Sequence, residues 1–66
     1  MNKITKERLV EIRETCRVLP RKGMEEANPE EERQIKTVWA YLPGTYSFYD
    51  TVNWMIKEYG KGEMPF

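Results

Sequence analysis

The stretch YLPGTYSFYD, residues 41–50, constrains the fold more than any other part of this sequence. Pro43 and Gly44 end a helix, because proline has no amide hydrogen to donate and glycine readily leaves the helical conformation. Ser47, followed three residues later by Asp50, is a capping-box pattern that begins a new helix. Two helices joined by so short a turn are expected to lie side by side, so the stretch predicts a helical hairpin.

Apolar residues recur at helical spacing on both sides of this turn. The helix before it is predicted over residues 29–42, where Asn28 and Glu31 form a second capping box and Pro29 suits the first helical position. The helix after it is predicted over residues 48–59. The apolar faces of these two helices comprise Ile35, Val38, Trp39 and Leu42, and then Phe48, Val52, Met55, Ile56 and Tyr59.

A further helix is predicted over residues 5–19, with Thr5 as its N-cap and Pro20 as its stop. Its apolar face comprises Leu9, Ile12, Cys16 and Leu19. Residues 21–28 are predicted to form a connector, because they are polar and acidic and contain glycine. Residues 60–66 are predicted to form a flexible tail, because they contain two glycines and a proline. The sequence therefore predicts one all-α domain over residues 1–66, built from three helices.

A chain of 66 residues buries a small core and commonly needs an additional source of stability. Cys16 is the only cysteine and there is no histidine, so an internal disulfide and a structural zinc site are not expected. Val10 and Val18 lie away from the apolar face of their helix, which indicates a second contact surface. Self-association and an efficient small helical bundle are the two remaining sources of stability, and we expect the first, a homo-oligomer.

The charged residues balance overall but are segregated along the chain. Residues 1–22 carry a net charge of +4 and residues 23–32 a net charge of −5. Proteins that bind duplex DNA usually carry a basic excess, so nucleic acid is not the expected partner. The sequence has no apolar run of transmembrane length and no signal-peptide pattern, and a lone cysteine is typical of reducing compartments. These features predict a cytoplasmic protein.

Trp54 does not fit the apolar face of its helix. At about 100° per residue it lies roughly 200° around the helix from Val52, beside Asp50 and Lys57. A tryptophan on a polar face exposes a large apolar area, which usually marks an interface, so we expect another molecule to cover this indole. A contact with a second subunit and an anchor for a ligand both remain open at this point.

Aromatic stacking combined with cationic side chains is a common way to hold nucleobases and phosphates. The candidate ligand-binding residues are Trp54, Tyr46 and Tyr49 for stacking, Asn53 for hydrogen bonding, and Arg33, Arg17 and Lys57 for phosphate. Neither a cofactor nor a metal is expected. For the cationic residues, a solvated helix face is the alternative interpretation.

Enzymatic activity has little support in the sequence, which has no histidine to act as a general base and no nucleophile-elbow, P-loop or dinucleotide-binding motif. Cys16 lies on an apolar face and is expected to be a buried core residue rather than a nucleophile. A helix-turn-helix DNA-binding regulator is a third possibility, in which the predicted helix 48–59 would read base edges. That helix offers only Asn53 and Lys57 for this role, and Asp50 lies where phosphates would be.

The segment RQIKTVWAYLPGTYSFYDTVNWMI, residues 33–56, resembles short accessory proteins of phages and prophages. In these proteins a helix ends in Leu-Pro-Gly, and the next helix starts with Ser-aromatic-x-Asp. The resemblance implies an origin in a mobile element, where small proteins often counter host defence. Some sequester nucleotide-derived immune signals in homo-oligomers, and others block a host protein directly. The expected function is thus sequestration of an anionic, nucleotide-derived signal, and the alternative is inhibition of a host defence or regulatory protein.

Overall fold

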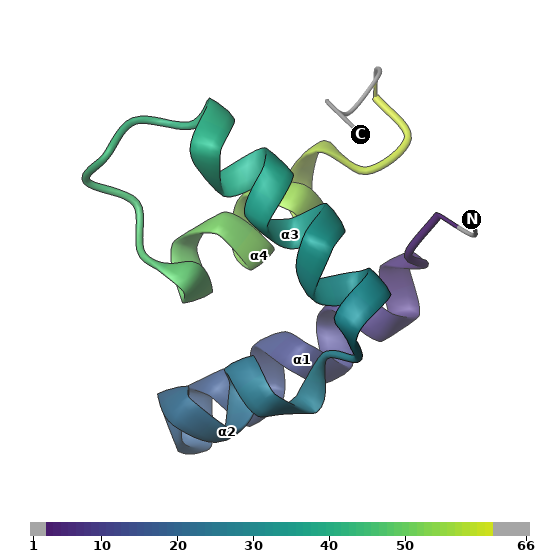
Figure 1. Cartoon of the computed structure of the whole chain (residues 1–66). Coiled ribbons are helices and arrows are strands. Elements are labelled where there is room, and N and C mark those ends of the chain that lie inside the picture. The colour runs from purple at the N-terminus through teal and green to yellow at the C-terminus, as the bar shows by residue number, and fades with distance from the viewer. Residues whose placement is uncertain (1–2, 62–66) are drawn as a thin grey trace.

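The structure is a computed structural model that describes residues 3–61. This part of the chain forms four helices. They are α1 (Lys6–Val18), α2 (Pro20–Glu26), α3 (Pro29–Tyr41) and α4 (Phe48–Glu58). Within these residues there is no strand, so the prediction of an all-α fold is confirmed. Helices α1 and α2 form one pair, α3 leads away from it, and α4 packs against both α1 and α3 (Figure 1).

The predicted number of helices is wrong, because the segment expected to be a connector contains α2. Pro20 ends α1 as predicted, but it also occupies the first position of α2, where its missing N–H is not required. Leu19 between the two helices has an extended backbone, with φ −152° and ψ 106°, so the chain reverses there. Leu19 is 47% exposed, and its predicted place in the core is also wrong.

Gly23 allows α2 to lie directly on α1. A Cβ atom added to Gly23 would overlap the Sγ atom of Cys16 and come within 2.7 Å of the Cys16 Cα atom. No side chain larger than hydrogen therefore fits at this crossing. Burial in this contact also raises the pKa of the Cys16 thiol, which keeps it in the neutral form.

The three predicted helix starts are confirmed. Thr5 Oγ1 accepts a hydrogen bond from the backbone N–H of Arg8. Both halves of the capping box are present at Asn28 and Glu31 and again at Ser47 and Asp50. Each box satisfies amide groups that the first turn of a helix leaves unpaired, and this fixes where α3 and α4 begin.

The core lies between α1, α3 and α4 and follows the predicted apolar faces closely. Its buried members are Ile4, Leu9, Ile12, Cys16, Ile35, Val38, Phe48, Val52 and Met55, with Trp39, Leu42, Ile56 and Tyr59 packed against them. Two polar side chains tie the N-terminal segment to this core. Gln34 Oε1 accepts from the Ile4 N–H at 2.8 Å, and the Tyr59 hydroxyl donates to the Ile4 carbonyl oxygen at 2.7 Å.

Arg8 links the starts of α1 and α3 through a network of carboxylates. Its guanidinium donates to both carboxylate oxygens of Glu31, to Glu11, and to the side chain and backbone oxygen of Glu26. Burial alone would raise the pKa of Glu31, but the hydrogen bonds from Arg8 and from the Asn28 N–H hold it below its ordinary value of 4.5. This pairing therefore stabilises the fold above that pH, and the stabilisation is lost as the pH falls through the lowered pKa.

The chain exposes an ordinary area for a folded protein of its size. Its accessible surface is 4548 Å², and a folded monomer of 7.9 kDa is expected to expose roughly 4,400 Å². Homo-oligomerisation therefore stays a prediction, which a light-scattering mass near 7.9 kDa would contradict. Residues 62–66 of the predicted flexible tail lie outside the described residues, and Gly60 and Lys61 form a turn after α4.

Replacing Gly23 with alanine should destabilise the fold, since the added methyl group must displace the backbone of α1 or α2. We expect the free energy of unfolding to fall by about 1–3 kcal/mol or more. Urea denaturation followed by circular dichroism measures this. Gly44→Ala is the matched control, because nothing lies within 4 Å of the added Cβ, and its effect should stay within about 0.5 kcal/mol. Equal effects of the two substitutions would contradict the close packing of α1 and α2.

Candidate functional site

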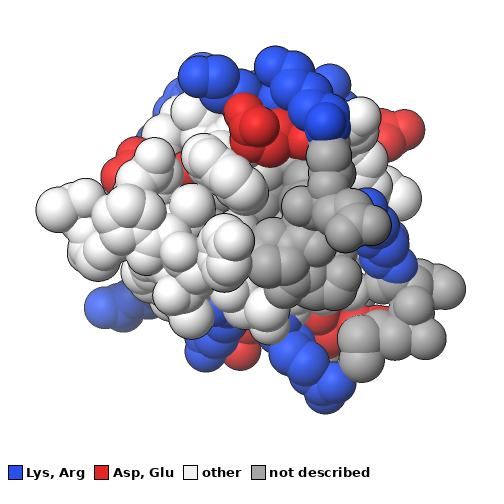
Figure 2. Space-filling view, turned by 90° about the horizontal axis from the view of Figure 1, so that it is seen from above, with Lys and Arg blue, Asp and Glu red and all other residues white. Residues whose placement is uncertain are grey.

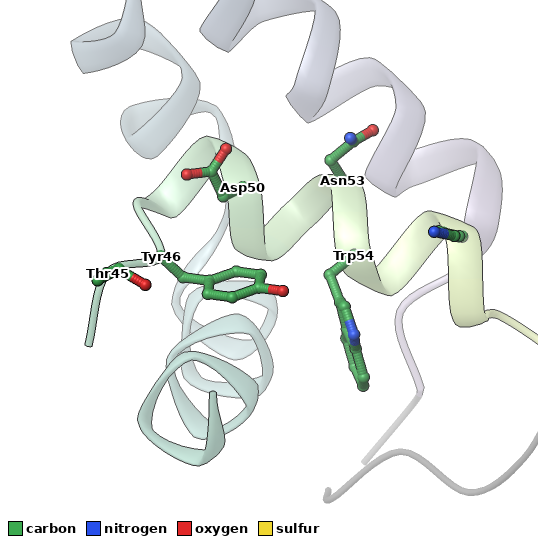
Figure 3. A pocket seen from close by; sticks show the side chains of 6 residues that line it. Thr45, Tyr46, Asp50, Asn53 and Trp54 are labelled. Atoms are coloured by element: carbon green, nitrogen blue, oxygen red, sulfur yellow. The ribbon is translucent and has the colours of Figure 1, made fainter. Parts of the chain in front are cut away.

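A hollow with a volume of about 350 Å³ lies beside α4 and the connection that precedes it. We call it the aromatic pocket. It is lined by Thr45, Tyr46, Asp50, Asn53, Trp54 and Lys57. In Figure 3 the rings of Tyr46 and Trp54 lie on one side of the α4 axis, and the side chains of Asp50 and Asn53 lie on the other. The pocket therefore combines an aromatic edge with a polar edge.

The connection between α3 and α4 is held in place by Trp39. Its indole Nε1–H donates to the backbone oxygen of Tyr46 at 2.8 Å. The same indole packs edge-on against Phe48, with ring centroids 5.9 Å apart and an angle of 67° between the ring planes. These two contacts fix the backbone at Tyr46, so that its ring lines the aromatic pocket.

Trp54 is half-buried, and part of its ring packs against the core. Trp54 therefore does contact the core, contrary to its predicted position away from the apolar face of the helix, and its cover by another molecule stays a prediction. The angle between Trp54 and Val52 around the helix axis takes only α4 into account. The connection before α4 places Tyr46 beside the face of α4 that carries Trp54 (Figure 3). The remaining exposed part of the indole lines the aromatic pocket.

Asn53 and Asp50 already take part in hydrogen bonds that orient them. Arg13 Nη1 on α1 donates to Asn53 Oδ1 at 3.1 Å. The Asp50 Oδ2 atom accepts from the backbone N–H of Ser47 at 3.2 Å as part of the capping box. Because both contacts are made within the chain, these polar groups are positioned before any ligand is present.

The structure brings together four of the seven predicted site residues, namely Trp54, Tyr46, Asn53 and Lys57. Tyr49 lies elsewhere and its hydroxyl oxygen accepts a weak, 3.4 Å hydrogen bond from Arg17 Nη2, a contact that raises the pKa of Arg17. Arg33 is exposed on α3 and does not line the pocket. Two of the three predicted phosphate-binding cations are therefore absent from it.

Tyr49 lines a second hollow, of about 360 Å³, between the start of α2 and the α3–α4 connection. We call it the apolar cleft. Its walls comprise Cys16, Pro20, Met24, Trp39, Ser47, Phe48 and Tyr49. Val18, which is 86% exposed, and Leu19 lie at the α1–α2 corner, next to Pro20 in the sequence. The exposure of Val18 confirms that this residue lies away from the buried face of α1, and the second contact surface stays a prediction.

Charged groups enter the aromatic pocket only from α4. The sequence has no charged residue between Lys36 and Asp50, and Figure 2 shows an uncharged surface at the left of the view, between two edges where Lys and Arg side chains gather. The lining thus contains one carboxylate, on Asp50, and one ammonium group, on Lys57. Their formal charges cancel.

Residues 3–61 contain no group of three or more potential metal ligands arranged to hold an ion. Among the same residues, no helix combines the length and apolarity needed to cross a membrane. Comparison with protein-family models, with curated proteins and with solved structures finds no match to this chain. The geometry of the site is therefore the basis for a functional proposal.

Trp39→Phe should loosen the turn that forms the aromatic pocket. Phenylalanine keeps the ring against Phe48 but removes the N–H, which leaves the Tyr46 carbonyl without this donor, and we expect a loss of about 1–2 kcal/mol in unfolding free energy. Urea denaturation measures the loss. Tyr41→Phe is the control, because Tyr41 is 73% exposed and its change should stay within about 0.5 kcal/mol. A wild-type stability for Trp39→Phe would show that the turn does not depend on this bond.

Proposed function

We propose that this chain is a non-enzymatic binding protein that sequesters a small nucleotide-derived ligand in the aromatic pocket. The observation that carries the proposal is the convergence of Tyr46, from the connection between α3 and α4, and Trp54, from α4, on one hollow that also contains Asn53 and Lys57. Stacking of a base on aromatic side chains is tolerant of base identity and contributes about 1–3 kcal/mol per base. The amide and the ammonium group supply hydrogen bonding and a contact for one phosphate.

The volume of the aromatic pocket indicates how large a part of a ligand it can hold. Sites for small molecules typically enclose about 300–1,000 Å³, and this hollow, at about 350 Å³, is near the lower end. It suits one nucleotide unit. A larger signal would extend beyond the pocket or require a second copy of the chain, in keeping with the expected homo-oligomer.

The resemblance of residues 33–56 to phage accessory proteins supports the biological setting of the proposal. In that setting the ligand is an immune signal of the infected cell, and the protein lowers its free concentration in the cytosol without chemical conversion. Binding alone is sufficient for this role, and binding requires neither a general base nor a nucleophile.

Calorimetric titration with a panel of nucleosides and nucleotides tests the proposal. Trp54→Ala should weaken binding at least about tenfold through loss of stacking, and Trp54→Phe should weaken it less. A ligand present at 100 times its dissociation constant should stabilise the fold by about 2.7 kcal/mol, which raises the melting temperature of so small a domain by roughly 10 °C or more.

Tyr41→Ala is the matched control for this experiment, because it removes an exposed aromatic ring outside the pocket. Binding that is equally sensitive to Tyr41→Ala and Trp54→Ala would contradict the assignment of the site. The absence of any heat of binding or thermal shift across the panel would contradict ligand sequestration.

Inhibition of a host protein is the second candidate, and the exposed apolar side chains of Val18 and Leu19 at the α1–α2 corner favour it. In this case Val18→Asp should weaken the complex with the purified host protein at least about tenfold, since buried apolar contacts dominate such interfaces. The same substitution should leave nucleotide titrations unchanged. If Val18→Asp leaves the affinity of this complex unchanged, the corner is not the contact surface.

A further inference from the structure

The spacing of the pocket residues on α4 defines a linear order of chemical groups. Asp50, Asn53, Trp54 and Lys57 follow one another at i, i+3, i+4 and i+7, so they form a stripe along one face of the helix. With a rise of 1.5 Å per residue, the Asp50 and Lys57 backbones are about 10 Å apart along the axis. A carboxylate thus marks one end of the stripe and an ammonium group the other, with the indole between them.

The hydrogen bond from Arg13 decides how the Asn53 amide faces the pocket. A guanidinium group only donates hydrogen bonds, so it must meet the amide oxygen of Asn53, and it does so at 3.1 Å. The amide nitrogen is consequently turned away from Arg13, and in Figure 3 it lies on the side of Asn53 that faces Asp50. Asn53 therefore offers donors to a ligand.

Asp50 offers the complementary acceptor. Its Oδ2 atom is used by the Ser47 N–H, whereas no hydrogen bond to Oδ1 occurs within residues 3–61. A donor from Asn53 and an acceptor from Asp50, one helical turn apart, match a ring edge that presents an acceptor beside an N–H donor. Purines and pyrimidines both have such an edge, but the larger ring system of a purine covers more of the Tyr46 and Trp54 surface, and this favours a purine.

The charges on this stripe of α4 limit the number of phosphate groups that a bound ligand can carry. Lys57 forms no ion pair with any described residue and is available to one phosphate group. Asp50 lies in the same pocket, and its negative charge opposes additional phosphates. Arg17 and Arg33, which could have offset further negative charge, lie outside the pocket.

From this order of groups, and resting on the function proposed above, we infer that the aromatic pocket is selective for a purine nucleoside monophosphate. The base edge meets Asp50 and Asn53, the ring stacks on Trp54, and the single phosphate pairs with Lys57. The corresponding nucleoside lacks the phosphate contact, and a triphosphate adds negative charge that Asp50 repels and that no second cation lining the pocket offsets.

Titration with guanosine and its mono-, di- and triphosphates, and with the adenosine series, tests the inference at constant ionic strength. Wild-type protein should bind the monophosphate of at least one purine up to about fivefold more tightly than the nucleoside, as expected for one exposed ion pair. Affinity should then fall from the monophosphate to the triphosphate. Lys57→Gln should remove the advantage of the monophosphate over the nucleoside.

Lys61→Gln is the matched control for Lys57, because it removes the same charge from an exposed residue outside the pocket. Asp50→Asn keeps an acceptor for the Ser47 N–H and removes the carboxylate charge, so it should reduce the penalty for the triphosphate; its melting temperature reports whether the cap is retained. An affinity that rises steadily from the monophosphate to the triphosphate would overturn the selection for a single phosphate. It would not contradict the proposed ligand pocket. Failure of every nucleoside and nucleotide to bind would overturn both.

Discussion

The hydrogen bond between Trp39 and the backbone of Tyr46 is the contact on which the candidate site depends. It joins the end of α3 to the connection that follows, and the edge-on packing of Trp39 on Phe48 fixes the same indole against the start of α4. The indole therefore spans both ends of the turn. Without it, the ring of Tyr46 would have no fixed position relative to Trp54, and the aromatic pocket would lose one of its walls.

The positions of three helices could be predicted from local signals because each has a self-contained start. Asn28 with Glu31, and Ser47 with Asp50, satisfy their own backbone amides within four residues, so tertiary packing does not need to place them. Helix α2 has no such signal. Its N-cap is Leu19, which makes no side-chain hydrogen bond, and the helix is stabilised by the contact of Gly23 with Cys16, which only the folded chain reveals.

The candidate site could be predicted in part for a similar reason. Trp54, Asn53 and Lys57 lie on one face of one helix, so their periodicity brings them together. Arg17 and Arg33 belong to α1 and α3, and composition and periodicity do not determine towards which side these helices turn their cations. The role of Arg13 had no sequence signal at all, because it acts on Asn53 from another helix, 40 residues away.

The bond from the Tyr59 hydroxyl to the carbonyl oxygen of Ile4 has a consequence for how this domain comes apart. It joins residues 55 positions apart, and Gln34 holds the amide of the same residue. The described chain is thereby closed into a loop, and loosening the segment before α1 also frees the end of α4 and a side chain in the middle of α3. Fraying at one terminus is thus transmitted to the other, which favours cooperative opening of the domain over stepwise loss of its outer helices.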